Sequence, residues 1–238
     1  NIQSIKTKFL ELEAFLVDQN FSLLAVTEHW LNDTEATNLQ IGSFSTTSYF
    51  SRKPSMKSCS YGGSMILQDS NLEYRTLEIC KELSVEKHVE ISGVRVCLKD
   101  HDIYVINIYR PPNGDLEVFF HTLSVLFSRI NITKNNVLIV GDFNVKFNTK
   151  ETKAERLCDF MACYELTPLV FFPTRNNNCL DNVFSNINAN FTTVSPVELM
   201  SDHCGIQLEI KIHKGVRDKT VTEKYRPITQ LGKNKFFD

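Results

Sequence analysis

Apolar residues recur along the chain with a helical period in three segments. Between residues 4 and 18 they recur at steps of four, three and four, the spacing of one helical face: Ile5, Phe9, Leu12 and Leu16. A second helix is predicted to follow Asp115, a residue type that caps helix starts, and a shorter third helix covers about residues 152–163.

Short apolar or alternating runs predict strands between these helices. The runs are 21–27, 65–67 after a Gly-Gly pair, 89–98, 103–109, 137–140, 180–184 and 205–212. In 205–212, Ile206, Leu208 and Ile210 alternate with polar residues, as in a strand with one buried face. Residues 99–102 form a polar turn of hairpin length, which argues against an all-parallel sheet. We therefore expect a layered α/β sandwich.

Two polar stretches interrupt these patterns. Residues 32–60 are rich in Ser, Thr, Lys and Asn, which predicts a long surface excursion with little helix or strand. Residues 214–238 carry seven Lys/Arg against three acidic residues and no apolar periodicity. We therefore expect a folded domain over residues 1–212 and a solvated linker over 213–238.

Composition and charge exclude several classes of protein. The 238 residues are 42% hydrophobic and 23% charged, with a formal net charge of −2, so DNA binding would have to rest on local patches. No apolar run approaches the roughly 18 residues of a membrane span, and no secretory signal is visible, so we expect an intracellular protein. The seven cysteines are scattered. Reduced packing thiols are favoured over a zinc site built from His203 and Cys204.

Charged and amide side chains follow buried strands in four places: Thr27–Trp30, Tyr109–Pro112, Gly141–Asn144 and Ser201–His203. Carboxylate and amide oxygens suit a hard divalent cation, and phosphodiester hydrolysis also needs a group that orients water and donors that neutralise the phosphate. Taken singly, each segment has an ordinary structural explanation, such as a turn or a helix cap. Their joint occurrence beside strands predicts a phosphate-hydrolysing centre.

Six short motifs give the sequence a family resemblance. The segments NIQSI, TEHW, YRPP, GDFN, LDNVF and SDH occur in the order seen in the endonuclease/exonuclease/phosphatase superfamily. The sequence is most similar to the apurinic-like endonuclease domain of non-LTR retrotransposons of the jockey-like, LINE type, over residues 1–212. The resemblance implies a four-layered α/β sandwich, two packed mixed β-sheets flanked by helices. It also implies that the first core strand precedes Asn1 and is missing from the chain.

The resemblance assigns roles to eight residues. The metal ligands would be Asn1, Glu28 and Asp202, with Mg²⁺ as the cofactor and Mn²⁺ as its alternative. The residues that act on water and phosphate would be Tyr109, Asp142, Asn144, Asp181 and His203. Among them Asp142 would be the general base, and Asp181 would orient His203 and keep it protonated. Whether Tyr109 donates a hydrogen bond or ionises is left open.

The activity that the resemblance implies is Mg²⁺-dependent nicking of double-stranded DNA, which leaves a 3′-hydroxyl for target-primed reverse transcription. The partners would be DNA and, in a full-length element, a covalently linked reverse transcriptase and the element RNA, in the nucleus and without a membrane. Lysines and arginines in the loops, including Arg52, Arg110 and Arg175, are candidates for phosphate contacts. One alternative is a phosphomonoesterase of the same superfamily. Another is a catalytically decayed DNA-binding remnant, against which the intact residue set argues.

Overall fold

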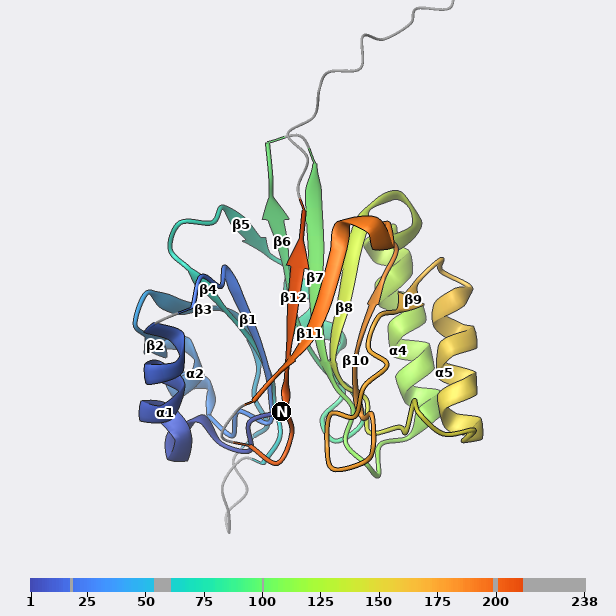
Figure 1. Ribbon diagram of the computed structural model, residues 1–238, viewed down its shortest axis with the longest axis horizontal. Helices are drawn as coiled ribbons and strands as arrows, with labels where there is room; N and C mark the ends of the chain where they lie inside the picture. Colours follow the sequence, from blue (N-terminus) through green and yellow to red (C-terminus); the bar gives the residue numbers. More distant parts are fainter. Residues whose placement is uncertain (18, 54–60, 100, 199–200, 212–238) are drawn as a thin grey trace, which may run out of the picture.

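Two large sheets pack between two layers of helices (Figure 1). The computed structural model describes residues 1–17, 19–53, 61–99, 101–198 and 201–211. The helices are α1 (Ile5–Val17), α2 (Asp33–Thr37), α3 (Glu78–Leu83), α4 (Leu116–Arg129) and α5 (Thr152–Ala162), with 3₁₀ turns η1 (Ile132–Lys134) and η2 (Ala189–Phe191).

The strands form two sheets and a separate ribbon. A four-stranded sheet has the order β1 (Leu23–Thr27), β4 (Ser64–Asp69), β3 (Phe44–Phe50), β2 (Gln40–Ile41). A six-stranded sheet has the order β5 (Tyr74–Thr76), β6 (Glu90–Cys97), β7 (Asp102–Tyr109), β8 (Asn136–Asp142), β10 (Asp181–Ser185), β9 (Thr167–Pro168). The ribbon pairs β11 (Thr192–Val197) with β12 (Gly205–Ile210).

The helices lie on the outer faces of the sheets, so the predicted four-layered sandwich is confirmed (Figure 1). Helices α1 and α2 lie beside the four-stranded sheet, and α4 and α5 beside the six-stranded sheet. Only β7 and β8 pair in parallel; the other pairs are antiparallel among the described strands. The six-stranded sheet is therefore mixed, as the hairpin pattern of the sequence predicted.

Helix α4 shows why the predicted helices form. The Asp115 carboxylate accepts hydrogen bonds from the backbone N–H groups of Glu117 and Val118, which caps the helix start. Its apolar stripe then packs into the core beside the six-stranded sheet, through Phe119, Leu123, Leu126 and Phe127. Helix α1 also buries its apolar face, through Leu12 and Leu16, in the core beside the four-stranded sheet. Each helix thus buries the face that its spacing predicted.

The prediction of an irregular excursion over residues 32–60 is wrong for its described part. That part contains α2, β2 and β3. Strand β3 was not predicted because two of its three buried side chains are polar. The Thr47 hydroxyl donates to the Ile66 carbonyl at 3.0 Å, and the Ser48 hydroxyl accepts from Gly93 N–H at 2.9 Å. These hydrogen bonds satisfy hydroxyls in a position that usually holds apolar residues. The strand therefore lacks the apolar alternation of a core strand.

Several expectations concern residues at the chain ends. Strand β12 confirms the predicted run 205–212 as far as Ile210. Residue 212 and the predicted linker 213–238 lie outside the described residues, and the strand expected before Asn1 lies outside the sequence, so both stay predictions. None of the described helices is long and apolar enough to cross a bilayer. The six described cysteines are free.

Candidate active site

Three predicted site residues lie side by side at the ends of neighbouring strands. Tyr109, the last residue of β7, pairs in register with Asp142, the last residue of β8. Asp142 in turn pairs with Asp181, the first residue of β10. Gly141 allows this close approach, because a Cβ at that position would lie 1.9 Å from the Ile108 carbonyl oxygen. The sheet register itself therefore places one phenol and two carboxylates in a row.

His203 reaches this row from the loop before β12. Its backbone pairs with Arg175, and its Nδ1 lies 2.7 Å from Oδ2 of Asp181. Thr174 holds Asp181 from the other side, because its hydroxyl accepts the N–H groups of Leu180 and Asp181. The His203 ring is buried, and its Nε2 has no hydrogen-bond partner in the described structure. That nitrogen is therefore available for a ligand.

Glu28 comes from the opposite sheet and meets the same centre. It follows the last residue of β1, and its backbone N–H donates to the Gly63 carbonyl at 2.8 Å. The amide Nδ2 of Asn1 donates to Oε1 of Glu28 at 2.7 Å and to Oδ2 of Asp142 at 2.8 Å. The Tyr109 hydroxyl also donates to Oε1 of Glu28, at 2.9 Å. Asn1 thus bridges carboxylates that belong to two sheets.

This donor set fits a divalent metal ion. Ligand atoms of Asp142, Asp181 and His203 all lie within 4.8 Å of one another. The carboxylates of Glu28 and Asp142 converge on a single amide nitrogen, and Oδ1 of Asn1 is buried without a partner among the described residues. Oxygen atoms of carboxylates and amides are the ligands that hard cations prefer. The site can therefore hold such an ion.

Burial and mutual repulsion set the protonation of the carboxylates. Burial, together with the nearby Asp181 carboxylate, raises the pKa of Asp142 to about 7. Asp181 is also buried, but its hydrogen bond with His203 lowers its pKa below the ordinary value. Two carboxylates in one site therefore favour different protonation states, a pattern typical of acid–base catalysis.

Tyr109 keeps its proton in this arrangement. Burial raises its pKa well above the ordinary value, and the adjacent Glu28 carboxylate raises it further. Ionising the phenol would place a second negative charge 2.9 Å from Glu28. The hydroxyl is therefore a hydrogen-bond donor.

Asn144 is hydrogen-bonded to Arg110 and to Asp142 of the centre. The Asn144 side chain donates to the Arg110 carbonyl at 2.9 Å, and its backbone N–H donates to Oδ1 of Asp142 at 2.9 Å. The Arg110 guanidinium is 1% exposed and donates to the carbonyls of Phe143 at 3.0 Å and Gly114 at 3.2 Å. Arg110 is thus a structural residue, and the suggestion that it contacts phosphate is wrong.

Asp202 and Arg52 each form an ion pair with a residue outside this centre. The Asp202 carboxylate forms a partly exposed ion pair with Arg175, at 2.6 Å. Its side chain makes no described contact with the other seven predicted site residues. The Arg52 guanidinium lies 2.5 Å from the buried Glu90 carboxylate, so its charge is already neutralised.

The segment that carries Glu28 is held in a strained conformation. Both Glu28 and Trp30 have left-handed backbones, with φ of 56°, which bulky residues rarely adopt. His29 between them is buried; its Nδ1 accepts the Leu31 N–H at 3.0 Å, so its Nε2 carries the proton donated to the Phe50 carbonyl at 2.9 Å. Neither His29 nor Trp30 has a role predicted from the sequence. Only their place in the TEHW motif marks them.

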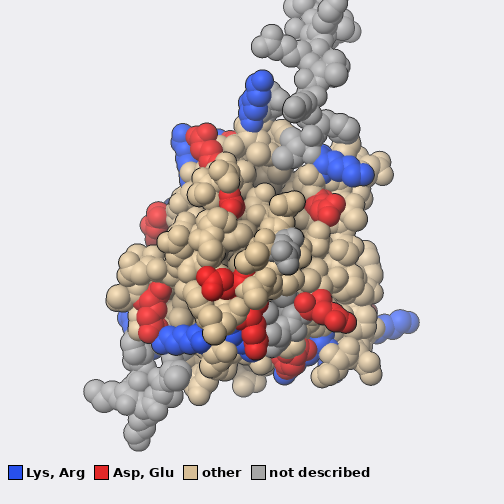
Figure 2. Space-filling view, turned by 60° about the vertical axis from the view of Figure 1, so that its left-hand side comes forward, with Lys and Arg blue, Asp and Glu red and all other residues tan. Residues whose placement is uncertain are grey.

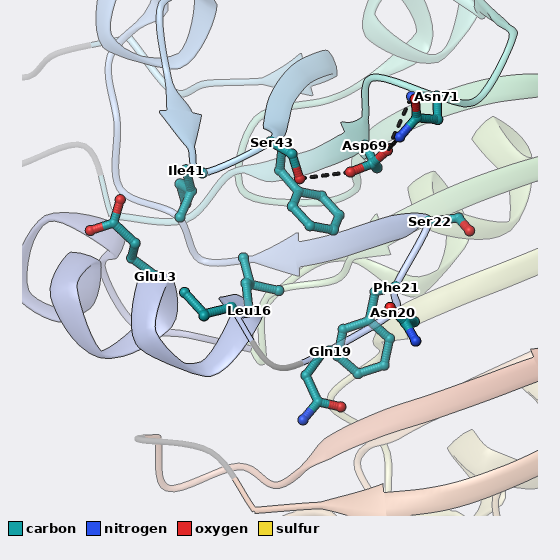
Figure 3. Close-up of a pocket in the computed structure, with 13 residues that line it drawn as sticks. Glu13, Leu16, Gln19, Asn20, Phe21, Ser22, Ile41, Ser43, Asp69 and Asn71 are labelled. Atoms are coloured by element: carbon teal, nitrogen blue, oxygen red, sulfur yellow. Dashed lines mark hydrogen bonds between the residues drawn. The ribbon is translucent and has the colours of Figure 1, made fainter.

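A concavity elsewhere contains none of the predicted site residues (Figure 3). It lies at the opposite end of β1, between the end of α1 and the turn from β2 to β3. Its polar wall is already paired, because Asp69 accepts hydrogen bonds from Ser43 and Asn71. On the face shown in Figure 2, basic and acidic side chains are interspersed, without a continuous basic stripe over the described residues.

Comparisons with known proteins agree with the motifs. Residues 103–207 match the endonuclease-reverse transcriptase family. No curated protein sequence matches the chain. Among solved structures, the endonuclease domain of TRAS1, a telomere-specific non-LTR retrotransposon, is 15% identical with a TM-score of 0.66, over 86% of this chain and 93% of that one.

Two further structures are similar in fold. A 3′-5′ exonuclease from Neisseria meningitidis is 15% identical with a TM-score of 0.65, over 89% of this chain and 98% of that one. An AP endonuclease from Leishmania major is 15% identical with a TM-score of 0.67, over 89% of this chain and 86% of that one. The chain therefore has the fold of the endonuclease/exonuclease/phosphatase superfamily, with the endonuclease-reverse transcriptase pattern over residues 103–207, and the resemblance seen in its motifs is confirmed.

Proposed function

We propose that the chain is a Mg²⁺-dependent DNA endonuclease that nicks one strand and leaves a 3′-hydroxyl for reverse transcription. One observation carries this proposal. Ligand atoms of Asp142, Asp181 and His203 lie within 4.8 Å of one another, and Asn1 links Asp142 to Glu28. The endonuclease-reverse transcriptase family and the retrotransposon endonuclease among the similar structures support DNA as the substrate.

Asp142 is the general base in this proposal. Its carboxylate takes a proton from water, whose oxygen forms a bond to phosphorus while the bond from phosphorus to O3′ breaks and the leaving O3′ takes up a proton from solvent. A pKa of about 7 suits this role, because a base works best when its pKa lies near the working pH. The hydrogen bond from Asn144 N–H to Oδ1 of Asp142 fixes the orientation of this carboxylate.

His203 and Tyr109 are donors in this proposal. Nε2 of His203 donates to a non-bridging phosphate oxygen, and Asp181 holds the ring by Nδ1. The Tyr109 hydroxyl donates within the same centre, since its raised pKa keeps it protonated. Asn144 carries an amide hydrogen beyond the one it gives to Arg110, which can reach the phosphate. These fixed donors stabilise charge on the phosphate as the bond breaks.

Asn1 and Glu28 would hold the metal ion, with Asp202 as a further ligand once it leaves Arg175. When bound, the ion supplies positive charge that polarises the phosphate. Mg²⁺ suits an oxygen-rich site that also admits water and phosphate, and Mn²⁺ is its alternative. In a full-length element a linked reverse transcriptase and the element RNA would be the partners, in the nucleus.

Incubating supercoiled plasmid with the protein and Mg²⁺ tests this function. We expect conversion to nicked circles, which EDTA and His203→Ala abolish and His121→Ala, an exposed position on α4, leaves intact. DNA polymerase should extend the nick without prior phosphatase treatment, because the end is a 3′-hydroxyl. Phosphate release from a phosphomonoester without nicking would instead favour the phosphatase alternative. DNA retention in a gel without cleavage would favour the decayed remnant.

A further inference from the structure

Two aromatic rings lie beside the candidate metal-binding carboxylate and take no part in the mechanism above. The indole Nε1 of Trp30 donates to Oε2 of Glu28 at 3.2 Å, so the edge of this ring touches the centre. The ring of Tyr61 packs against Trp30 with centroids 4.7 Å apart and an interplanar angle of 82°. Tyr61 is 51% exposed, although large aromatic side chains are usually well buried.

The backbone holds this pair rigidly. Trp30 N–H donates to the Gly62 carbonyl at 3.1 Å, and Glu28 N–H donates to the Gly63 carbonyl at 2.8 Å. All four residues have positive φ angles. Gly63 could not be replaced, since a Cβ there would lie 2.2 Å from the His29 ring. Backbone strain of this kind persists where it positions functional groups.

Tyr61 stays about half exposed although it packs against Trp30. In an edge-to-face contact, the ring that presents its edge keeps both faces free of its partner. The hydrogen bond to Glu28 fixes the Trp30 ring, so little side-chain freedom remains to be lost on binding. Flat, rigid aromatic faces stack on nucleobases, each of which has a π-face of its own.

We propose that Trp30 and Tyr61 form a stacking site for an unpaired nucleobase next to the scissile phosphate. The proposal rests on the proposed function, since the base belongs to the strand that is cut. The site would favour nucleic acid over a phosphomonoester that carries no base, because such a phosphomonoester has nothing to stack on Trp30 and Tyr61. It would also favour strands whose bases are locally unstacked.

Trp30 is the only tryptophan of the chain, so its fluorescence reports on this site alone. The probes are a short thymidine oligonucleotide and an abasic oligonucleotide with the same phosphates, titrated with Ca²⁺ in place of Mg²⁺. We expect the thymidine oligonucleotide to quench Trp30 and to bind about tenfold more tightly than the abasic one. Tyr61→Ala should remove most of that difference. Tyr74→Ala, an exposed tyrosine on β5, should behave as wild type.

Equal quenching by both oligonucleotides would overturn the stacking site, as would a Tyr61→Ala effect of the same size on both. Quenching by mannose 6-phosphate but not by thymidine would assign the rings to a sugar and overturn it as well. The plasmid assay separates this result from the proposed function. Nicking without base-dependent quenching removes the stacking site alone, whereas quenching without nicking removes the hydrolytic function and leaves a base-binding site that is not part of a cleavage centre.

Discussion

Oδ2 of Asp181 lies 2.7 Å from Nδ1 of His203, and both side chains are buried. The pair joins residues from β10 and from the loop before β12, which only the folded chain brings together. The hydrogen bond fixes the ring, so that Nε2 remains free for a ligand.

Asp181→Asn should lower the nicking rate about 100-fold, because the amide keeps the shape but loses the charged acceptor that holds Nδ1 of His203. Single-turnover nicking of plasmid measures this rate. Asp159→Asn, an exposed carboxylate on α5, is the matched control. A rate equal to that of the control would show that the pair is only structural.

His29 should make the stability of the protein depend on pH. Burial lowers its pKa from 6.5 to about 4, so between these values the unfolded chain binds a proton that the folded protein does not. Stability is therefore full above pH 6.5 and falls as the pH drops toward 4, by roughly 3 kcal/mol. Urea unfolding at a series of pH values measures this slope.

His29→Gln should flatten that slope, at the cost of lower stability at neutral pH. His121→Gln, at an exposed histidine, should keep the wild-type slope. The explanation fails if His29→Gln and wild type lose the same free energy of unfolding between pH 6.5 and 4.

Arg110→Met should destabilise the fold by roughly 3 kcal/mol. The guanidinium pairs with the buried carbonyls of Phe143 and Gly114, and each carbonyl left unpaired costs about 1–3 kcal/mol. Thermal and urea unfolding measure the change, and Arg129→Met, at an exposed position on α4, is the control. Wild-type stability with weaker DNA binding would restore the phosphate-contact role for Arg110.

Glu28 should matter more for the metal ion than Asp202. Glu28 is held in the centre by Asn1 and Tyr109, whereas Asp202 pairs with Arg175 at the surface. Glu28→Gln should raise the Mg²⁺ concentration for half-maximal nicking by at least about tenfold. Asp202→Asn should raise it less. The reverse order would mean that Asp202 leaves Arg175 and becomes the principal ligand.

The sequence predicted the elements whose residues follow a simple apolar period. Helix α4 buries its regular face, and strand β12 partly buries the alternating Ile206, Leu208 and Ile210. Strand β3 was missed because Thr47 and Ser48 satisfy their hydroxyls inside the sandwich, which single-sequence periodicity does not reveal. Short elements such as β9 carry too few residues for any period to emerge.

The candidate site was accessible from motifs, but its geometry was not. The motifs picked out Glu28, Asp142, Asp181 and His203, and the structure brings these side chains into one centre. Arg110 was misread, because nothing in the sequence distinguishes an arginine that caps buried carbonyls from one that faces solvent. Trp30 gained a role only from its contact with Glu28.

The most direct test of the central claim is single-turnover nicking of supercoiled plasmid by Asp142→Asn beside the wild type, with Mg²⁺ and with EDTA. Both proteins should have the same circular dichroism spectrum, because the substitution preserves shape. If Asp142 is the general base of a metal-dependent centre, wild type nicks only with Mg²⁺, and Asp142→Asn is slower by about 100-fold or more. Nicking by Asp142→Asn at the wild-type rate, or by wild type in EDTA, would contradict the account.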